Sequence, residues 1–221
     1  MKIVIQCAGS KNTQLPRSGF HTSDGRLVKF VADPKSAPSS DHQYAYAKPD
    51  DLSDGQHTWR ERILDYNKEA KSNPLSLLPA YRLYKNKVYE RLVNKFGINK
   101  IFILSAGWGL IASDFLTPDY DITFSYDKEK PYVRRRKSDH YADLCQLLND
   151  GDTIVFIGGI DYLPLFCQLT KELTGKKKVF YNSSAVPALG NGFYPERFQT
   201  QDPRNWQYIC AQALIDGKIK I

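Results

Sequence analysis

Carboxylates and aromatic side chains are concentrated in one short stretch of the sequence, residues 105–121. Asp114 and Asp121 lie there, together with Trp108 and Tyr120. A fixed carboxylate can act as a general acid or base, and it can stabilise positive charge that develops during a reaction. Aromatic rings can stack on a base that has left its duplex. The stretch therefore has the residue types of a site for nucleobases, although an indole serves equally well in a protein core.

An apolar strand is predicted directly before this stretch. Residues 101–104 have the sequence Ile-Phe-Ile-Leu, which is typical of a strand buried on both faces. Ser105 follows, and then Gly107 and Gly109 flank Trp108. We expect a sharp turn here, at the carboxyl end of the strand, where open α/β sheets bind their ligands.

Three more apolar runs predict strands whose carboxyl ends lead into small or polar residues. These runs and the polar residues at their ends are 2–6 with Gln6 and Lys11, 153–157 with Asp161, and 177–181 with Asn182. Parallel strands present their carboxyl ends at one edge, so we expect a single site there. Ser105, Gln6 and Asn182 would contact the polar edge of a base. Asp161 is either a second catalytic carboxylate or a helix cap.

Helical patterns alternate with these strands. They cover residues 58–71, 80–96, 139–148 and about 203–215, with another helix after Asp161; Thr58 and Glu61 form a capping-box pattern. This alternation predicts an α/β fold with a mainly parallel central sheet and helices on both faces. We expect one domain over residues 1–221, with a long irregular insertion at about 13–57.

The densest group of cations follows the carboxylate stretch. It consists of Arg134, Arg135, Arg136 and Lys137. Such a run suits a phosphate clamp, to which Lys11 would add a further contact, and it suits an ordinary solvated surface as well. The formal net charge of +7 favours a polyanionic partner such as DNA. The 14 Tyr, 11 Phe and 3 Trp residues strengthen that expectation because unpaired bases stack on such rings.

Several classes of protein are disfavoured by what the sequence lacks. Its four cysteines lie far apart without a Cys-x-x-Cys pair, so we expect neither a metal site nor a disulfide framework. It has no Walker phosphate loop, dinucleotide fingerprint or nucleophile elbow, and we expect no cofactor. No apolar run approaches the length of a membrane span, and no signal-peptide pattern begins the sequence. We expect a cytoplasmic protein without a membrane partner.

Four segments of the sequence are similar to motifs of a known family. The most specific is Leu104–Leu110, Leu-Ser-Ala-Gly-Trp-Gly-Leu, which matches a Leu-Ser-(Gly or Ala)-x-x-Gly-(Val or Leu) motif; the others are Cys7–Lys11, Leu83–Tyr89 and Pro118–Asp121. With these segments the chain resembles the YaaA-like family, named for a bacterial peroxide-stress protein. It departs from that protein at Asp121, where the stress protein has an arginine.

The resemblance implies an α/β fold with a positively charged cleft that binds DNA. Proteins associated with this fold act on modified bases, and they include anti-phage DNA glycosylases that remove glucosylated hydroxymethylcytosine. The leading hypothesis is therefore a DNA glycosylase, with Asp121 as first choice for the catalytic carboxylate, Asp161 as second and Asp114 as third. Two alternatives are a non-enzymatic DNA-binding stress protein and a transferase that modifies a nucleobase or nucleotide.

Overall fold

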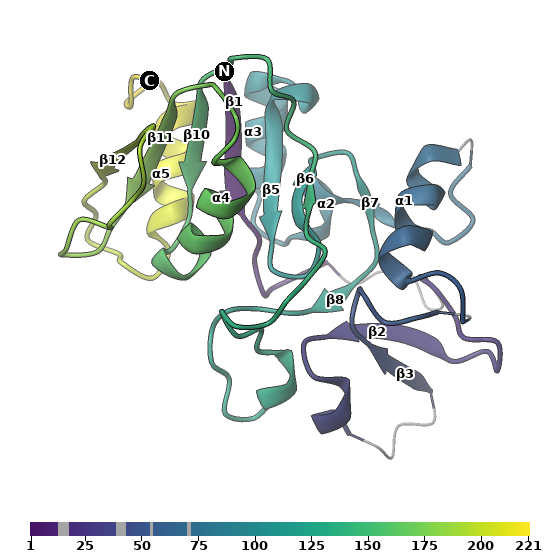
Figure 1. The fold of residues 1–221 in the computed structure, drawn as a ribbon. Helices are drawn as coiled ribbons and strands as arrows, with labels where there is room; N and C mark the ends of the chain where they lie inside the picture. The colour runs from purple at the N-terminus through teal and green to yellow at the C-terminus, as the bar shows by residue number, and fades with distance from the viewer. Residues whose placement is uncertain (13–17, 39–42, 54, 70–71) are drawn as a thin grey trace.

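A seven-stranded sheet forms the centre of the protein. The computed structural model describes residues 1–12, 18–38, 43–53, 55–69 and 72–221. The strand order is β12-β11-β10-β1-β5-β6-β9 (Figure 1). The strands are β1 (Lys2–Gln6), β5 (Ile101–Ser105), β6 (Gly109–Ala112), β9 (Leu144–Cys145), β10 (Ile154–Ile157), β11 (Lys177–Tyr181) and β12 (Phe193–Arg197). All neighbours are parallel except β5 and β6, so the predicted α/β fold with a mainly parallel sheet is confirmed.

The central strands β5, β1 and β10 are the apolar runs that the sequence predicted as strands. Every residue of β5 and β10 is buried, as a parallel sheet covered on both faces requires. Val4 of β1 pairs with Phe102 on one side and with Phe156 on the other. The fourth predicted strand, β11, continues the sheet in the same direction.

Helices cover both faces of this sheet. On one face α3 (Val88–Phe96) packs against α5 (Trp206–Ile215), and α4 (Leu163–Thr170) lies on the opposite face (Figure 1). Phe166 of α4 stacks on Phe156 of β10 with 4.4 Å between the ring centroids. The helices predicted after Asp161 and near the end of the sequence are both present.

The helix predicted over residues 80–96 is interrupted. The structure has α2 (Ala80–Leu83) and then α3, separated by an extended Tyr84 with ψ 139°. The loop after β1 pairs with this break, because Asn12 N donates to Leu83 O at 2.7 Å and Lys85 N donates to Ser10 O at 3.2 Å. These tertiary hydrogen bonds replace the intrahelical ones.

The prediction of a helix over residues 139–148 is wrong. The segment contains β9 instead, which extends the sheet beyond β6. Leu144 N donates to Trp108 O at 3.0 Å, and Gln146 N donates to Leu110 O at 2.9 Å. The free edge of β6 thus satisfies the backbone groups that a helix would have paired internally.

The predicted amino-terminal helix is α1 (Trp59–Glu69). Its capping box is present: Thr58 N donates to Glu61 Oε2 at 2.7 Å, and Glu61 N donates to Thr58 Oγ1 at 3.2 Å. The last two residues of the predicted helix, 70 and 71, lie outside the described ranges.

A small parallel sheet packs beside the main one. Its order is β3 (Tyr44–Ala47), β2 (Leu27–Val31) and β8 (Tyr120–Asp121). Part of the predicted irregular insertion at 13–57 is therefore regular, while its residues 13–17, 39–42 and 54 lie outside the described part. Phe30 of β2 meets Trp108 edge to face, with 5.0 Å between the ring centroids. This contact joins the two sheets.

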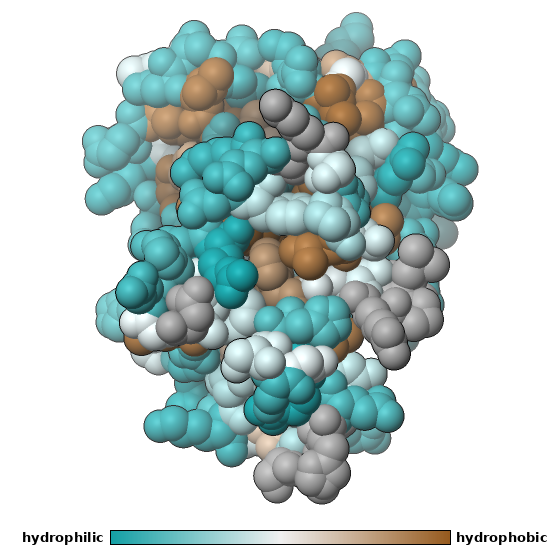
Figure 2. Space-filling view, turned by 90° about the vertical axis from the view of Figure 1, so that its right-hand side faces the viewer, coloured by the Kyte–Doolittle hydropathy of each residue, from teal (hydrophilic) through white to brown (hydrophobic). Residues whose placement is uncertain are grey.

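The remaining elements are short. They are the antiparallel pair β4 (Leu78–Pro79) and β7 (Leu116–Thr117), and the 3₁₀ turns η1 (Pro34–Ser36), η2 (Ile98–Lys100), η3 (Pro131–Val133) and η4 (Ile160–Tyr162). The face that carries α1 and the small sheet is mainly hydrophilic, with small groups of hydrophobic residues showing between the polar ones (Figure 2). Among the described helices none is long and apolar enough to cross a bilayer.

Candidate functional site

The carboxyl ends of β1, β5, β10 and β11 meet at one edge of the main sheet, as the sequence predicted. From β1 the chain reaches β5 on one side and later β10 on the other, so the strand order reverses at β1. Doubly wound sheets bind ligands at such a reversal, in the crevice outside the strand ends. Gln6 and Gly159 join the two tips here, because Gly159 N donates to Gln6 Oε1. The side-chain oxygen of Gln6 is thus already engaged.

The turn between β5 and β6 is buried. Ser105 Oγ accepts hydrogen bonds from Gly107 N at 3.2 Å and Trp108 N at 3.1 Å, and it donates to Tyr120 Oη at 2.9 Å. Trp108 is fully buried and lies between Phe30 and Tyr120. Trp108 therefore packs in the core, which was the second of the two roles that the sequence allowed for its indole. It offers no face on which a base could stack in this conformation.

Phenol groups form a buried network beside that turn. Tyr120 Oη and Tyr84 Oη are 2.8 Å apart, and Cys7 Sγ lies 3.2 Å from Tyr162 Oη. Burial raises the pKa of Tyr84, Tyr120 and Tyr162 well above the usual tyrosine range. All three phenols therefore stay neutral at physiological pH. Tyr120, predicted to stack on a base, is instead a buried hydrogen-bonding group.

A lysine and a carboxylate flank this network on its solvent side. The Lys11 ammonium lies 4.5 Å from the centroid of the Tyr120 ring. Asp119 as a whole is exposed at the surface, but neighbouring protein atoms partly desolvate its carboxyl and raise its pKa, while the charge of Lys11 opposes the shift. A perturbed carboxyl at the carboxyl edge of a sheet is a candidate acid or base.

Sequence reasoning did not select Asp119 or Cys7. Asp119 belongs to the same carboxylate-rich connection as Asp121, but no periodicity or motif distinguishes the desolvated carboxyl from its neighbour. Cys7 was noted as one of four dispersed thiols and as the first residue of the motif Cys7–Lys11, but it was given no role in the site. The signal that could have indicated it is its place directly after β1, at the reversal of strand order.

The three predicted catalytic carboxylates lie in different places. Asp114 follows β6, which runs antiparallel to β5, and the preceding Ser113 N donates to Ile101 O at the start of β5. Asp114 is therefore at the opposite edge of the sheet and cannot join a site at the strand tips. Asp121 is half-buried and lies 3.6 Å from the Lys130 ammonium. Asp161 is exposed in the turn between β10 and α4.

Asn182 lies at the expected edge, after β11. Its amide nitrogen donates to Phe198 O at 2.6 Å and so tethers the segment that follows β12. The side-chain oxygen is the part of Asn182 that remains for a ligand.

The four consecutive cations separate into two kinds. Arg135 is buried, and its guanidinium forms two hydrogen bonds to Asp143, of 2.8 and 2.6 Å, and a third to Ala106 O at 2.8 Å. The prediction that Arg135 belongs to a phosphate clamp is therefore wrong, because the Asp143 carboxylate already binds its guanidinium. Arg134, Arg136 and Lys137 are exposed. Alternation along the extended chain turns Arg135 inward and its neighbours outward.

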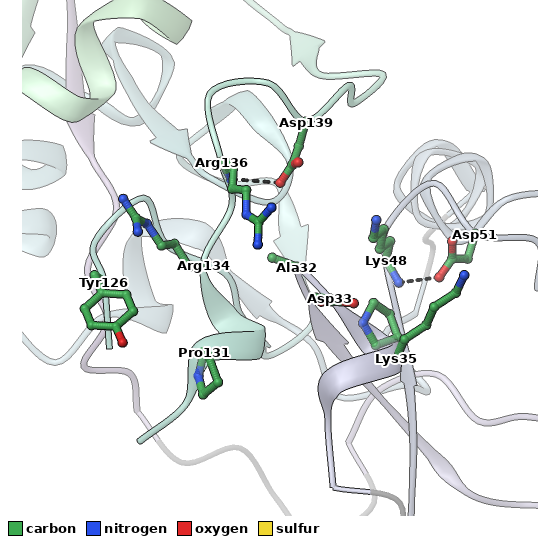
Figure 3. A pocket seen from close by; sticks show the side chains of 11 residues that line it. Ala32, Asp33, Lys35, Lys48, Asp51, Tyr126, Pro131, Arg134, Arg136 and Asp139 are labelled. Atoms are coloured by element: carbon green, nitrogen blue, oxygen red, sulfur yellow. Dashed lines mark hydrogen bonds between the residues drawn. The ribbon is translucent and has the colours of Figure 1, made fainter. Parts of the chain in front are cut away.

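Arg134 and Arg136 line a hollow of about 620 Å³. We call it the basic hollow and define it by Lys35, Lys48, Tyr126, Arg134 and Arg136 (Figure 3). Lys35 and Lys48 come from the insertion and were not predicted as site residues. Within the described part of the chain, none of the four cationic side chains is ion-paired. In the view of Figure 3, Arg136 lies between Arg134 and Lys48.

Three carboxylates also border the basic hollow, so that the cations exceed them by four to three. Each of the carboxylates accepts a local hydrogen bond. Asp51 accepts one from Lys48 N at 2.7 Å, Asp139 one from Arg136 N at 2.8 Å, and Asp33 one from Ser36 Oγ at 2.8 Å. They fix the loops from which the cations project. The cationic side chains remain available to an anionic ligand.

A second, smaller cavity of about 230 Å³ adjoins the basic hollow. We call it the edge pocket and define it by Phe124, Arg135, Tyr141, Asp161 and Gln168, with Lys137 also in its wall. Arg136 and Asp139 line both cavities. The structure thus brings Asp161 together with all three predicted arginines and Lys137, across one shared wall.

Comparison with known proteins adds no assignment, since no protein-family model, curated protein or solved structure matches the chain. Within the described ranges, no three His, Cys, Asp or Glu side chains are grouped as metal ligands.

Proposed function

We propose that the protein is a DNA glycosylase that hydrolyses the N-glycosidic bond of a modified base. The observation that carries the proposal is the shared wall of Arg136 and Asp139 between a cationic hollow and a carboxylate-bearing pocket. A DNA strand needs cations along its phosphates, and the reaction needs a carboxylate close to the sugar. Both features occur side by side at the carboxyl edge of the sheet.

The basic hollow supports DNA as the partner. Four cations without ion-pair partners in the described chain surround it, and the exposed Tyr126 ring lies 5.5 Å from the Arg134 guanidinium. Backbone contacts from Lys and Arg together with an exposed aromatic ring are typical of surfaces that bind nucleic-acid strands. The same surface serves a protein that only binds DNA, and this is the second candidate function.

Two carboxylates support hydrolysis. Asp161 faces the edge pocket, where an anion would stabilise an oxocarbenium-like sugar. Asp119 is not part of the wall of either cavity, but it has the raised pKa expected of a group that protonates a leaving base or takes a proton from water. Asp121 is a weaker choice than either, because its half-exposed carboxylate lies beside the Lys130 ammonium at 3.6 Å. The modified phage base and the role in anti-phage defence come from the resemblance to YaaA-like proteins.

An abasic-site assay tests the proposal. Purified protein is incubated with glucosylated hydroxymethylcytosine DNA and with unmodified DNA, and released base and abasic sites are quantified. We expect release from the modified DNA alone, and a loss of at least about a hundredfold in Asp161→Asn or Asp119→Asn. Asp114→Asn is the matched control because it alters an exposed aspartate at the opposite edge, and it should retain full activity.

The outcomes separate the candidates. Binding of DNA without base release would refute the glycosylase and favour the binding protein. An increase in the mass of a nucleoside substrate would instead indicate the transferase. Equal activity in Asp161→Asn, Asp119→Asn and wild type would refute both carboxylate assignments.

A further inference from the structure

Two buried polar atoms at the edge pocket have no hydrogen-bond partner. They are Arg135 Nε and Tyr141 Oη, and both residues line the pocket. Arg135 uses its two terminal nitrogens for Asp143 and Ala106, so that Nε is the donor left over. A buried donor without a partner is rare and costs free energy. Acceptor atoms of a bound ligand would satisfy both groups.

The walls of the edge pocket suit a flat ring. The Arg135 guanidinium lies 3.9 Å from the centroid of the Tyr141 ring and 5.4 Å from that of Phe124. At 3.9 Å the guanidinium stacks directly on the Tyr141 ring with no gap between them, so the two groups form one flat piece of wall against which an aromatic ligand could pack. The volume of about 230 Å³ equals that of roughly seven or eight waters at about 30 Å³ each, which is comparable with one nucleobase.

The charges around the edge pocket are balanced, unlike those around the basic hollow. Arg135, Arg136 and Lys137 stand against three aspartates, namely Asp139, Asp143 and Asp161. Without the excess of cations that the basic hollow has, the edge pocket attracts a phosphate group less strongly than that hollow does. A balanced lining favours a neutral ligand with both donors and acceptors on its edge. Gln168 on α4 adds an amide that can serve in either role.

The position of the edge pocket relative to the basic hollow completes the argument. Arg136 and Asp139 line both, so a strand held in the basic hollow passes directly by the mouth of the pocket. The rings expected from the sequence to receive a base, those of Trp108 and Tyr120, are buried in the core.

We propose that the edge pocket receives one nucleobase extruded from DNA whose backbone lies in the basic hollow, with Arg135 Nε and Tyr141 Oη donating to acceptors of the base. The inference rests on the proposed interaction with DNA and not on the hydrolytic reaction. It names the place and the contacts of the extruded base, which the carboxylate assignments leave open.

The test compares the affinity of the protein for two end-labelled duplexes by fluorescence anisotropy. One duplex is fully paired, and the other has a base opposite an abasic position, where extrusion needs no unpairing. Because extrusion from a paired duplex costs a few kcal/mol, wild-type protein should prefer the second duplex by about tenfold or more. Gln168→Trp fills the pocket from an exposed position of α4 and should abolish this preference while affinity for the paired duplex is kept.

Matched variants separate the pocket from general effects. Gln199→Trp places the same ring at another exposed glutamine and should keep the preference. Tyr141→Phe removes only the hydroxyl and should reduce affinity for the second duplex by about fivefold to tenfold, the effect of one buried hydrogen bond. Tyr194→Phe removes an exposed hydroxyl on β12 and should change neither affinity.

The result that overturns the inference is an equal preference in wild type and Gln168→Trp, or no preference in wild type. Failure of wild type to bind either duplex would overturn the DNA partner and the inference together. A preference that Gln168→Trp abolishes, combined with no base release from modified DNA, would support the pocket and refute the glycosylase reaction.

Discussion

Arg60 of α1 binds the main chain of Trp108 and also faces its indole. Arg60 Nη1 donates to Trp108 O at 3.1 Å, and the guanidinium carbon lies 5.5 Å from the centroid of the Trp108 ring. Arg60 Nη2 donates to Gly107 O at 2.9 Å, and Nε is paired with Asp50. A residue of α1 therefore fixes the turn after β5 from outside the main sheet, as Arg135 does from the other side through Ala106 O.

Arg60→Leu should strongly destabilise the protein. The substitution leaves Asp50 and two turn carbonyls without their buried donor, and breaking such a buried pair costs about 3 to 5 kcal/mol. Urea denaturation should show a lower midpoint at an unchanged m value. Arg26→Leu, which removes an exposed pair with Asp24, should leave the midpoint where it is. Similar midpoints for the two variants would contradict the structural role of Arg60.

The three consecutive arginines should respond differently to substitution by glutamine. Arg134→Gln and Arg136→Gln should each weaken DNA binding and reduce the slope of log K against log salt by about one, without lowering the Tm. Arg135→Gln should instead lower the Tm, because Asp143 loses its buried partner. Salt-dependent binding titrations and thermal melts distinguish these effects. Equal salt slopes and equal melting temperatures for all three variants would contradict the distinction between a buried, structural Arg135 and two exposed arginines that bind DNA.

The apolar strands could be predicted because their burial on both faces imposes a continuous hydrophobic run. This applies to β1, β5, β10 and β11, and hence to the edge at which their tips converge. β2 also had a detectable signal, since four of the five residues of Leu27–Val31 are apolar and two of them are β-branched, but the surrounding Ser, Pro and Gly residues obscured it.

The errors arose where distant contacts override local preference. The pattern over 80–96 is helical, yet hydrogen bonds from the loop after β1 open the chain at Tyr84. The two-residue strand β9 exists only because β6 offers it an edge. In the same way, Arg135 has the same side chain as its neighbours, and nothing in the local sequence indicates that Asp143 draws it inward. The sequence thus predicted that the ends of the strands meet at one edge of the sheet. It did not predict which of the residues at that edge are buried and which are accessible to a ligand.

Asp119→Asn should stabilise the protein at neutral pH, with a gain that disappears on acidification. Partial desolvation of its carboxyl raises the pKa of the surface residue Asp119 above its ordinary value of 3.8, so the folded state holds this proton more tightly than the unfolded state. Stability of the wild type therefore falls as pH rises from 3.8 through the folded pKa, and the penalty is complete above it. Urea unfolding of both proteins between pH 3 and pH 7 measures the difference. A gain that grows toward low pH would have the wrong sign and refute the desolvation of this carboxyl.

Gly109→Ala should disrupt the turn that joins β5 to β6 and the pairing of β9. Gly109 has φ +88°, a conformation that costs a side chain about 1 to 2 kcal/mol, and an added Cβ would lie 2.5 Å from both Leu144 N and Leu144 O. Since Leu144 N donates to Trp108 O, relief of the overlap must move β9 away from β6. We expect a loss of more than about 2 kcal/mol in unfolding free energy, together with faster amide exchange at Leu144 and Gln146. Gly9→Ala is the matched control in the loop after β1, because an added Cβ there meets no atom within 4 Å. Unchanged exchange at Leu144 in Gly109→Ala would show that β9 does not depend on the glycine.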